Sequence, residues 1–453
     1  MSQVTRRGFL MGCSAAIAGL AGARFNSMAF AQGGVNNEEI LVVVFLRGGV
    51  DGLNLVPPIG GADRGFYEAA RPTIKIPVSG VGAALPLGGG FGLHPAAAAL
   101  HPLYQAGKLA IVQAVGLNVV NRSHFDAMQF VELGTPGSRA ISSGWLTRHL
   151  ASAANLPSEI VMPSLAIGDL QPASLLGDLE TINIANPDQF SLDNGPWQWR
   201  SAQRVALRDL YQGGTTWQHQ SGVQALDALD IVELNVAGGY TPANGAVYPN
   251  SGFGDHLKVL AQMIKLDLGL QVATVDVGGW DTHEEEGGAT GYFANLVSDL
   301  SAGLAAFYTD LDGAGAQNYT NRLTVVVQSE FGRELRENSD SGTEHGYGNQ
   351  MFVLSGNAIG GLHGTWPTLA PGALTDGTDL AVTTDYRRVL SEILIRRMGN
   401  NRLGQIFPNY ANYAPLGVVA GTDLAPDYST TGDTIFSDGF ENATTSRWSS
   451  VSG

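Results

Sequence analysis

The sequence predicts an α/β fold with a doubly wound, mainly parallel sheet that is flanked by helices. Continuous apolar runs rich in β-branched residues recur along the 453-residue chain, and such runs are typical of strands buried on both faces. Polar, glycine-rich turns and segments of helical periodicity separate them. This alternation is the order of a doubly wound sheet, and the length is sufficient for one large domain of that kind.

Each predicted element rests on its own pattern. The runs that we assign to strands are residues 40–46, 109–115, 271–277, 323–328 and 350–354. The segments that we assign to helices are residues 96–108, 126–133 and 292–312. In the last of these, apolar residues recur at the spacing of one helix face, from Leu296 to Leu311.

Two segments depart from this alternation. Prolines interrupt residues 155–255, and Trp197, Trp199 and Trp217 gather there. We predict a cap or insertion, with an amphipathic helix around 199–211. Residues 417–453 are rich in Thr, Ser, Asp and Gly, which is typical of a flexible tail. The α/β domain is therefore predicted to span 38–416.

Composition excludes several classes of function. The chain has 41 acidic against 25 basic residues and a formal charge of −16, so a nucleic-acid partner is not expected. Cys13 is the single cysteine, which rules out a disulfide framework and any cysteine-based metal site. A metal held by this chain would need oxygen and nitrogen ligands.

The first 31 residues have the pattern of an export signal. Arg6-Arg7 precede Gly-Phe-Leu, a mildly apolar stretch follows, and Ala29-Phe-Ala31 has the form of a cleavage site. The pair of arginines resembles a twin-arginine signal, which implies the twin-arginine translocase as a partner during export. The expected location is the periplasm, the cell surface or the medium. A membrane anchor is the less favoured alternative, because the apolar stretch falls short of the roughly 20 residues that span a bilayer.

Acids and histidines stand where the predicted strands end. Ligands of open α/β sheets bind outside the carboxyl ends of the strands, so we expect these side chains to converge. Carboxylates and imidazoles are ligands for Zn²⁺, Mn²⁺, Mg²⁺ or Ca²⁺. The candidate ligands are Asp51, Asp281, His283, Glu330 and His345.

Other roles are open for these residues. Asp51 could satisfy its own turn, and Asp281 could cap a helix, with Asp276 as a rival carboxylate. Glu330 could form a surface ion pair with Arg333, and His345 could be structural.

A serine near a predicted helix start is the candidate nucleophile. Ser123 lies between Arg122 and His124, and a bound metal could activate its hydroxyl. The alternative is a capping role with Asp126. Arg333 could hold an anionic substrate oxygen in a bidentate fork.

The order of these residues along the chain resembles the alkaline phosphatase and sulfatase superfamily. More closely, the chain resembles a bacterial twin-arginine-exported family, catalogued as domain of unknown function number 1501. The segments that carry this resemblance are Phe45–Asn54, Asn121–Phe125, Gly278–His283, Ser329–Arg333 and Gly342–Gly346. They extend over almost the whole predicted domain, and the family brings no assigned reaction.

The superfamily resemblance implies an alkaline-phosphatase-like fold and a set of roles. Asp51 and Glu330 would bind one divalent ion, and Asp281 (or Asp276), His283 and His345 a second. Ser123 would attack a phosphate or sulfate ester while Arg122 or Arg333 steadies the anion. One departure is Phe331, which stands where the phosphatases have a histidine, so one metal site could be incomplete.

The sequence thus predicts an exported, metal-dependent hydrolase with one or two divalent ions. The expected substrate is an anionic ester, with polysaccharide- and lipid-derived esters as candidates. The first alternative is a non-catalytic binding or assembly protein on the same fold with a degraded metal site. The second is a transferase that modifies surface polysaccharides, with the tryptophans of 197–217 as a sugar platform.

Overall fold

The computed structural model describes residues 37–430 apart from 155, 157–161, 169, 187–191, 193–196 and 236–238. The predicted signal segment 1–31, Cys13 and the end of the predicted tail, 431–453, lie outside the described residues. The side chains of Trp197 and Trp217 lie outside them as well.

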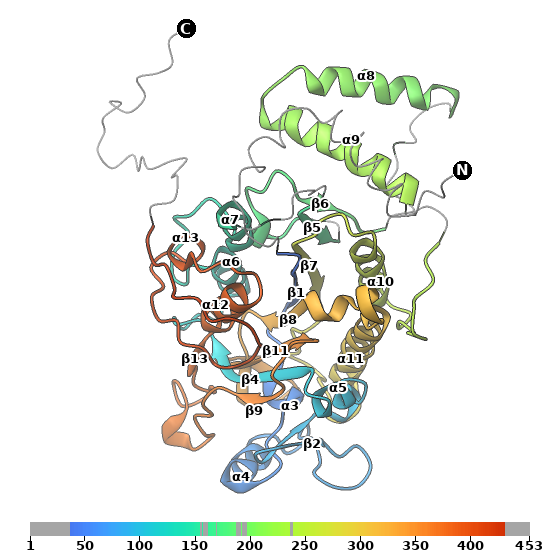
Figure 1. The fold of residues 1–453 in the computed structure, drawn as a ribbon. Helices are drawn as coiled ribbons and strands as arrows, with labels where there is room; N and C mark the ends of the chain where they lie inside the picture. Colours follow the sequence, from blue (N-terminus) through green and yellow to red (C-terminus); the bar gives the residue numbers. More distant parts are fainter. Residues whose placement is uncertain are drawn as a thin grey trace.

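A nine-stranded sheet forms the centre of the described chain (Figure 1). Its order is β12-β4-β11-β8-β1-β7-β5-β6, and β13 pairs with β4 beside this path. The strands are β1 (Ile40–Leu46), β4 (Leu109–Gly116), β5 (Ser164–Ile167), β6 (Ile182–Asn183), β7 (Val272–Val277), β8 (Leu323–Ser329), β11 (Asn349–Ser355), β12 (Gly361–His363) and β13 (Thr384–Asp385). Every strand predicted from an apolar run is therefore present in the sheet.

Strand β11 alone runs against the others in the described sheet. It pairs antiparallel with both β4 and β8, whereas the remaining pairs are parallel. The start of β11 therefore lies at the edge where β1, β7 and β8 end. This direction explains how a residue that precedes a strand can meet residues that follow other strands.

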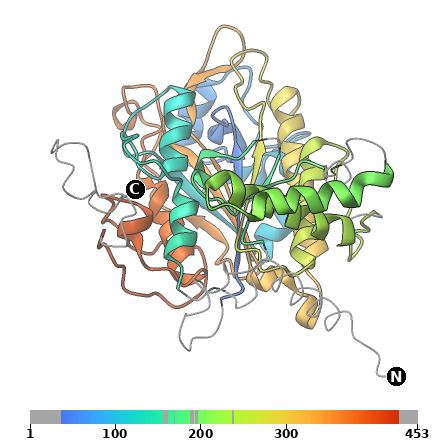
Figure 2. The same cartoon turned by 90° about the horizontal axis from the view of Figure 1, so that it is seen from above.

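Helices cover both faces of the sheet, as a doubly wound fold requires (Figures 1 and 2). Along β1, Val42 and Val44 pack into one core with α10 (Gly252–Lys265) and α11 (Tyr292–Leu311). The intervening Val43 and Phe45 pack into the other. That second core contains residues of α6 (His124–Leu133), α7 (Trp145–Ser152), α12 (Tyr386–Arg396) and α13 (Leu403–Ile406). Successive strand residues point to opposite faces, which is why they enter different cores. The mainly parallel sheet with helices on both faces confirms the predicted α/β fold.

Several short elements lie outside the nine-stranded sheet. They are α3 (Gly52–Leu55), α4 (Gly61–Ala70), α5 (His101–Gln105) and the antiparallel pairs β2 (Leu85–Gly88) with β3 (Phe91–Leu93) and β9 (Arg333–Glu337) with β10 (Thr343–His345). The predicted helix 96–108 is wrong in its extent: a 3₁₀ turn at Pro95–Ala97 precedes the short α5. Pro102 lacks an amide proton and fits the first turn of a helix but not its interior.

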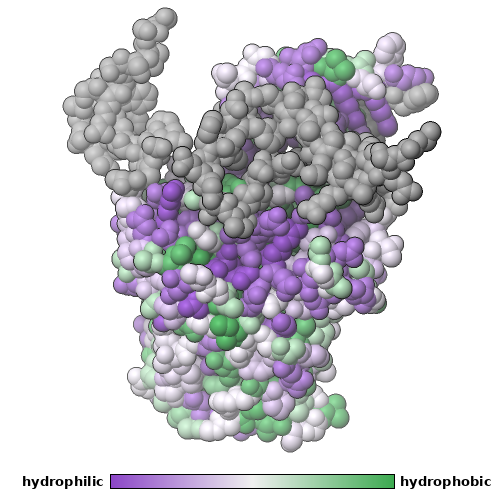
Figure 3. Space-filling view, viewed as in Figure 1, coloured by the Kyte–Doolittle hydropathy of each residue, from purple (hydrophilic) through white to green (hydrophobic). Residues whose placement is uncertain are grey.

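The predicted cap around 155–255 is smaller than expected. Leu165 and Ile182 are buried in the core, so β5 and β6 extend the main sheet. What projects is a hairpin of α8 (Arg200–Gln212) and α9 (Trp217–Asn235) (Figures 1 and 2). Helix α8 confirms the amphipathic helix predicted around 199–211. In the space-filling view, hydrophobic and hydrophilic residues are mixed on this hairpin (Figure 3).

Residues 417–419, just after the predicted boundary at 416, contact the α/β domain. Val418 and Val419 are fully buried against α12. The amides of Gly417 and Val418 donate to the carboxylate of Glu392 at 3.0 and 2.8 Å. These contacts hold residues 417–419 against the domain, and the flexible tail beyond them stays a prediction.

Candidate metal centre

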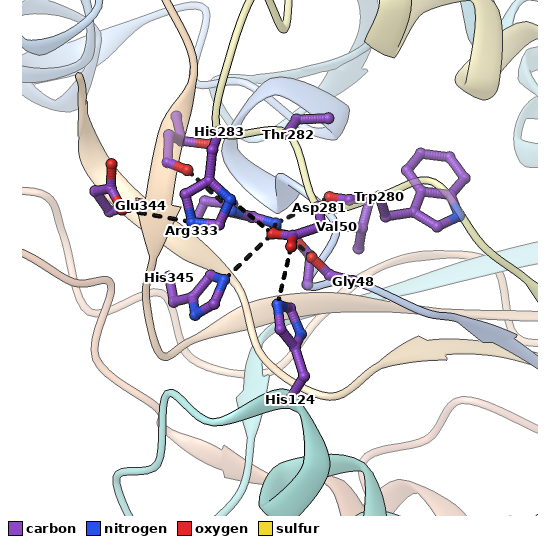
Figure 4. Close-up of polar contacts among 12 residues, drawn as sticks. Gly48, Val50, His124, Trp280, Asp281, Thr282, His283, Arg333, Glu344 and His345 are labelled. Carbon is purple, nitrogen blue, oxygen red and sulfur yellow. Dashed lines mark hydrogen bonds and ion pairs between the residues drawn. The ribbon is translucent and has the colours of Figure 1, made fainter. Parts of the chain in front are cut away.

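Three side chains from distant parts of the chain converge at the carboxyl edge of the sheet. One ligand atom from each of His124, Asp281 and His345 lies within 4.8 Å of the other two (Figure 4). His124 begins α6, Asp281 follows β7, and His345 ends β10 just before β11. We call these three residues the triad. Its donor set of two imidazoles and one carboxylate is one that Zn²⁺ or Mn²⁺ accepts.

Both histidines of the triad are held through Nδ1, which leaves Nε2 facing the carboxylate of Asp281. His124 Nδ1 lies 2.7 Å from Glu330 Oε1, and His345 Nδ1 donates to the carbonyl of Arg122 at 2.8 Å. The two Nε2 atoms lie 3.4 and 3.2 Å from Asp281 oxygens. His124 Nε2 is buried and has no hydrogen-bond partner among the described residues. Metal-binding histidines are typically fixed in this way.

The charges around the triad favour an ionised Asp281. Burial opposes its ionisation, but the hydrogen bond and charge of Arg333, together with His283 and His345, lower the pKa of Asp281 to about 2. The hydrogen bond to Glu330 raises the pKa of His124, and burial lowers the pKa of His345. The carboxylate that the two histidines share is therefore ionised at neutral pH, with Arg333 as its cationic partner.

His283 and Glu330, two further predicted ligands, lie next to the triad. His283 Nδ1 is 2.9 Å from Asp281 Oδ1, and its Nε2 is 3.4 Å from Glu344 (Figure 4). Glu330 is fully buried behind His124, where it also accepts from the amide of Gly48 at 2.8 Å. The structure thus places Glu330 as the partner of a histidine and His283 beside the shared carboxylate.

The structure does not bring Asp51 or Asp276 into the triad. Asp51 is fully buried and forms an ion pair with the equally buried Arg71. It also accepts from the amide of Leu53 as the cap of α3, which agrees with the turn role left open above. Asp276 pairs with Arg47 at 2.8 Å.

Arg122 and Arg333, expected to face an anion, are engaged within the protein. The Arg333 side chain is fully buried and donates to Asp281 at 2.6 Å; its other donors go to main-chain carbonyls, including those of Gly49 and Thr343. It therefore orients Asp281. The Arg122 side chain is 36% exposed, and its guanidinium binds Asp379 and Asp376.

Ser123 occupies the cap position of α6. It is exposed, and within the described part of the chain its side chain makes no capping hydrogen bond. The predicted bond of a capping box is therefore missing, and the hydroxyl is free of that role. The carbonyl of Ser123 accepts from Ala127 at 2.9 Å.

Phe331 forms a wall of the site instead of a ligand. It is buried, and its ring centroid lies 4.9 Å from that of His124 and 5.0 Å from that of His345. Gly49 must be a glycine here, because a Cβ would lie 2.5 Å from the Phe331 ring and φ is +70°.

Sequence reasoning missed His124 as a candidate ligand. Its one signal was its place in the Asn121–Phe125 segment, directly after Ser123. Nothing in the local pattern separated a ligand from a helix-start histidine. Its role depends on Glu330, which is distant in the sequence.

Comparisons with known proteins find a family model that part of the chain matches. Residues 244–399 match the model of the family described as protein of unknown function (DUF1501). This agrees with the resemblance noted for Gly278–His283, Ser329–Arg333 and Gly342–Gly346, which lie inside that range. Asp281 and His345 lie within it, and His124 lies before it. No curated protein matches the chain in sequence.

Among solved structures, the chain is similar to the lipoteichoic acid synthase LtaP from Listeria monocytogenes. The two share 9% sequence identity with a TM-score of 0.28, over 77% of this chain and 73% of LtaP.

Proposed function

We propose that this protein is an exported, metal-dependent hydrolase of phosphate or sulfate esters. One observation carries the proposal: two histidines are fixed through Nδ1 by oxygen acceptors, and both direct Nε2 at one ionised carboxylate. Metal-binding histidines are almost always held in this way, by an oxygen partner on the ring nitrogen that does not bind the metal.

The residues of the triad fit a divalent ion. His124, Asp281 and His345 would hold it, with Glu330 and Arg333 fixing their orientation. His283 lies beside the same carboxylate and would be a ligand of a second ion, so we propose one or two ions. A bound ion would supply Lewis-acid polarisation and charge stabilisation. Zn²⁺, Mn²⁺, Mg²⁺ and Ca²⁺ are the candidates.

Ser123 is the proposed nucleophile. Its exposed hydroxyl directly precedes His124 and lies at the N-terminus of α6. The free amides and the dipole of a helix N-terminus favour an anionic ester group. Arg122 would steady that group with the exposed part of its guanidinium, while Arg333 keeps Asp281 in place.

Replacing Ser123 by alanine tests this assignment. Purified protein is assayed with aryl phosphate and aryl sulfate, with and without a chelator, after its bound metals have been measured. We expect a metal-dependent rate that Ser123→Ala lowers by at least about 10³-fold, whereas the exposed Ser142→Ala does not change it. An unchanged rate in Ser123→Ala would exclude this nucleophile. Absence of both bound metal and turnover, even with added ions, would refute the hydrolase.

Export is the second part of the proposal. It rests on the twin-arginine pattern and the cleavage site ending at Ala31. No helix in the described residues is long and apolar enough to cross a membrane. We expect the mature protein from a native-type host to begin at Gln32. N-terminal sequencing checks this, and an intact Met1 in the exported fraction would contradict it.

A non-catalytic binding or assembly protein on the same fold is the second candidate. One observation favours it: carboxylates already neutralise the guanidinium groups of Arg122 and Arg333. A protein of this kind, with its degraded metal site, would show no turnover in the assay above, even with added ions.

A further inference from the structure

Glu286 is a buried acid on the same loop as Asp281. Its side chain is fully buried, and the roles proposed above do not involve it. Burial and the neighbouring charge of Asp51 raise the pKa of Glu286 well above its ordinary value. This shift favours the protonated form of Glu286, which glutamine resembles in shape and charge.

One oxygen of Glu286 joins the two segments that carry triad residues. Oε2 accepts from Thr282 Oγ1 at 3.0 Å and from Thr343 Oγ1 at 2.7 Å. The main chains of the two segments are also bonded, because the Thr343 amide donates to the Thr282 carbonyl at 3.0 Å. The amide of Glu286 itself donates to Ser341 at 3.0 Å.

The two threonines stand next to metal-binding candidates. Thr282 lies between Asp281 and His283, and Thr343 precedes His345 on β10. His345 Nε2 lies 3.2 Å from Asp281 Oδ1. Because each threonine is close in sequence to Asp281 or His345, a change in the separation of the two threonines would change that distance. The hydrogen bonds of both hydroxyls to Glu286 fix this separation.

The other oxygen of Glu286 is anchored in the core of the domain. Oε1 accepts from Asn54 Nδ2 at 3.1 Å, and Asn54 in turn accepts from the Tyr67 hydroxyl at 2.5 Å. Asn54 and Tyr67 are both fully buried. Asn54 thus fixes one oxygen of Glu286, while the other oxygen binds the hydroxyls of Thr282 and Thr343.

We propose that Glu286 is a positioning residue that sets the spacing of Asp281 and His345 through the hydroxyls of Thr282 and Thr343. The expected effect of Glu286 on metal affinity rests on the proposed function. Its expected effect on the order of segments 280–286 and 341–345 is independent of that function.

The test measures Zn²⁺ affinity of the full chain by competition with a chelator. Glu286→Leu removes both acceptor oxygens, and we expect it to weaken Zn²⁺ binding on the order of 10- to 100-fold, as loss of an outer partner does. Glu286→Gln keeps a carbonyl oxygen for both hydroxyls and should stay within about threefold of the wild type. Glu285→Gln, at the exposed neighbouring acid, is the matched control and should change nothing.

Thr343→Val tests the connection itself. It removes the hydroxyl at nearly constant shape, so Zn²⁺ binding should weaken in the wild type but not further in Glu286→Leu. Hydrogen exchange of residues 280–286 and 341–345 gives a readout that needs no metal. We expect both segments to exchange faster together in Glu286→Leu, and both to keep their protection in Glu286→Gln.

The outcomes separate the two proposals. A folded Glu286→Leu with wild-type exchange, or with wild-type Zn²⁺ affinity and only a lower melting temperature, overturns the positioning role. If the unaltered protein binds no Zn²⁺, the metal-dependent function fails, and exchange in the two segments alone decides the positioning role. If Glu286→Leu does not fold, Thr343→Val decides: unchanged exchange in both segments overturns the proposal.

Discussion

Asp281→Asn is expected to weaken metal binding strongly and to lower the rate of hydrolysis with it. Asp281 is the shared partner of His124, His345 and Arg333, and its low pKa means that it carries a negative charge at neutral pH. Asparagine keeps the shape but lacks the charge, so the buried Arg333 would repel a cation without compensation. We expect metal affinity to fall by more than about 100-fold, beyond the usual cost of losing an outer partner.

Asp276→Asn is the matched control for this prediction. Asp276 is the rival carboxylate at the end of β7, but it pairs with Arg47. Its variant should retain bound metal, as measured by metal analysis after gel filtration. The reverse result, with metal lost in Asp276→Asn and kept in Asp281→Asn, would show that the triad is the wrong site.

Asp51→Ala is expected to cost about 3–5 kcal/mol in the free energy of unfolding. The variant leaves the guanidinium of Arg71 as an unpaired charge, although both partners are fully buried. Urea unfolding at neutral pH measures the loss. The control is Glu68→Ala, which breaks the half-exposed Arg64–Glu68 pair on α4 and should cost only about 0.3–0.5 kcal/mol.

The stabilisation that Asp51 provides is expected to depend on pH. Burial alone would raise the pKa of Asp51, but the charge and hydrogen bonds of Arg71 lower it below 3.8. Its contribution is therefore present above that value and is lost as the pH falls below it. The difference between wild type and Asp51→Ala should narrow in acid.

A chelator distinguishes a structural ion pair of Asp51 with Arg71 from the predicted role of Asp51 as a metal ligand. Because Asp51 faces Arg71 rather than the triad, the loss in Asp51→Ala should be the same with and without chelator. A loss that disappears when metal is removed from both proteins would instead make Asp51 a ligand.

Local pattern was sufficient for five of the nine strands of the described sheet, β1, β4, β7, β8 and β11, and for the edge at which the candidate site lies. The apolar run 40–46 matches β1, because burial on both faces demands such a run wherever the strand lies. Asp281 and His345 meet because parallel strands end at one edge and the antiparallel β11 starts there. The predicted convergence of residues at strand ends needed no knowledge of contacts.

The same sequence determined which chemical groups reach that edge: carboxylates, imidazoles and a serine, with no cysteine beyond Cys13. Only the tertiary structure decided their partners. Asp51 is bound to Arg71, Glu330 holds His124, and Arg333 is buried against Asp281. The physical reason is range. Periodicity reports which face of an element is buried, whereas an ion pair or hydrogen bond is set by ångström-scale distances between residues far apart in the chain.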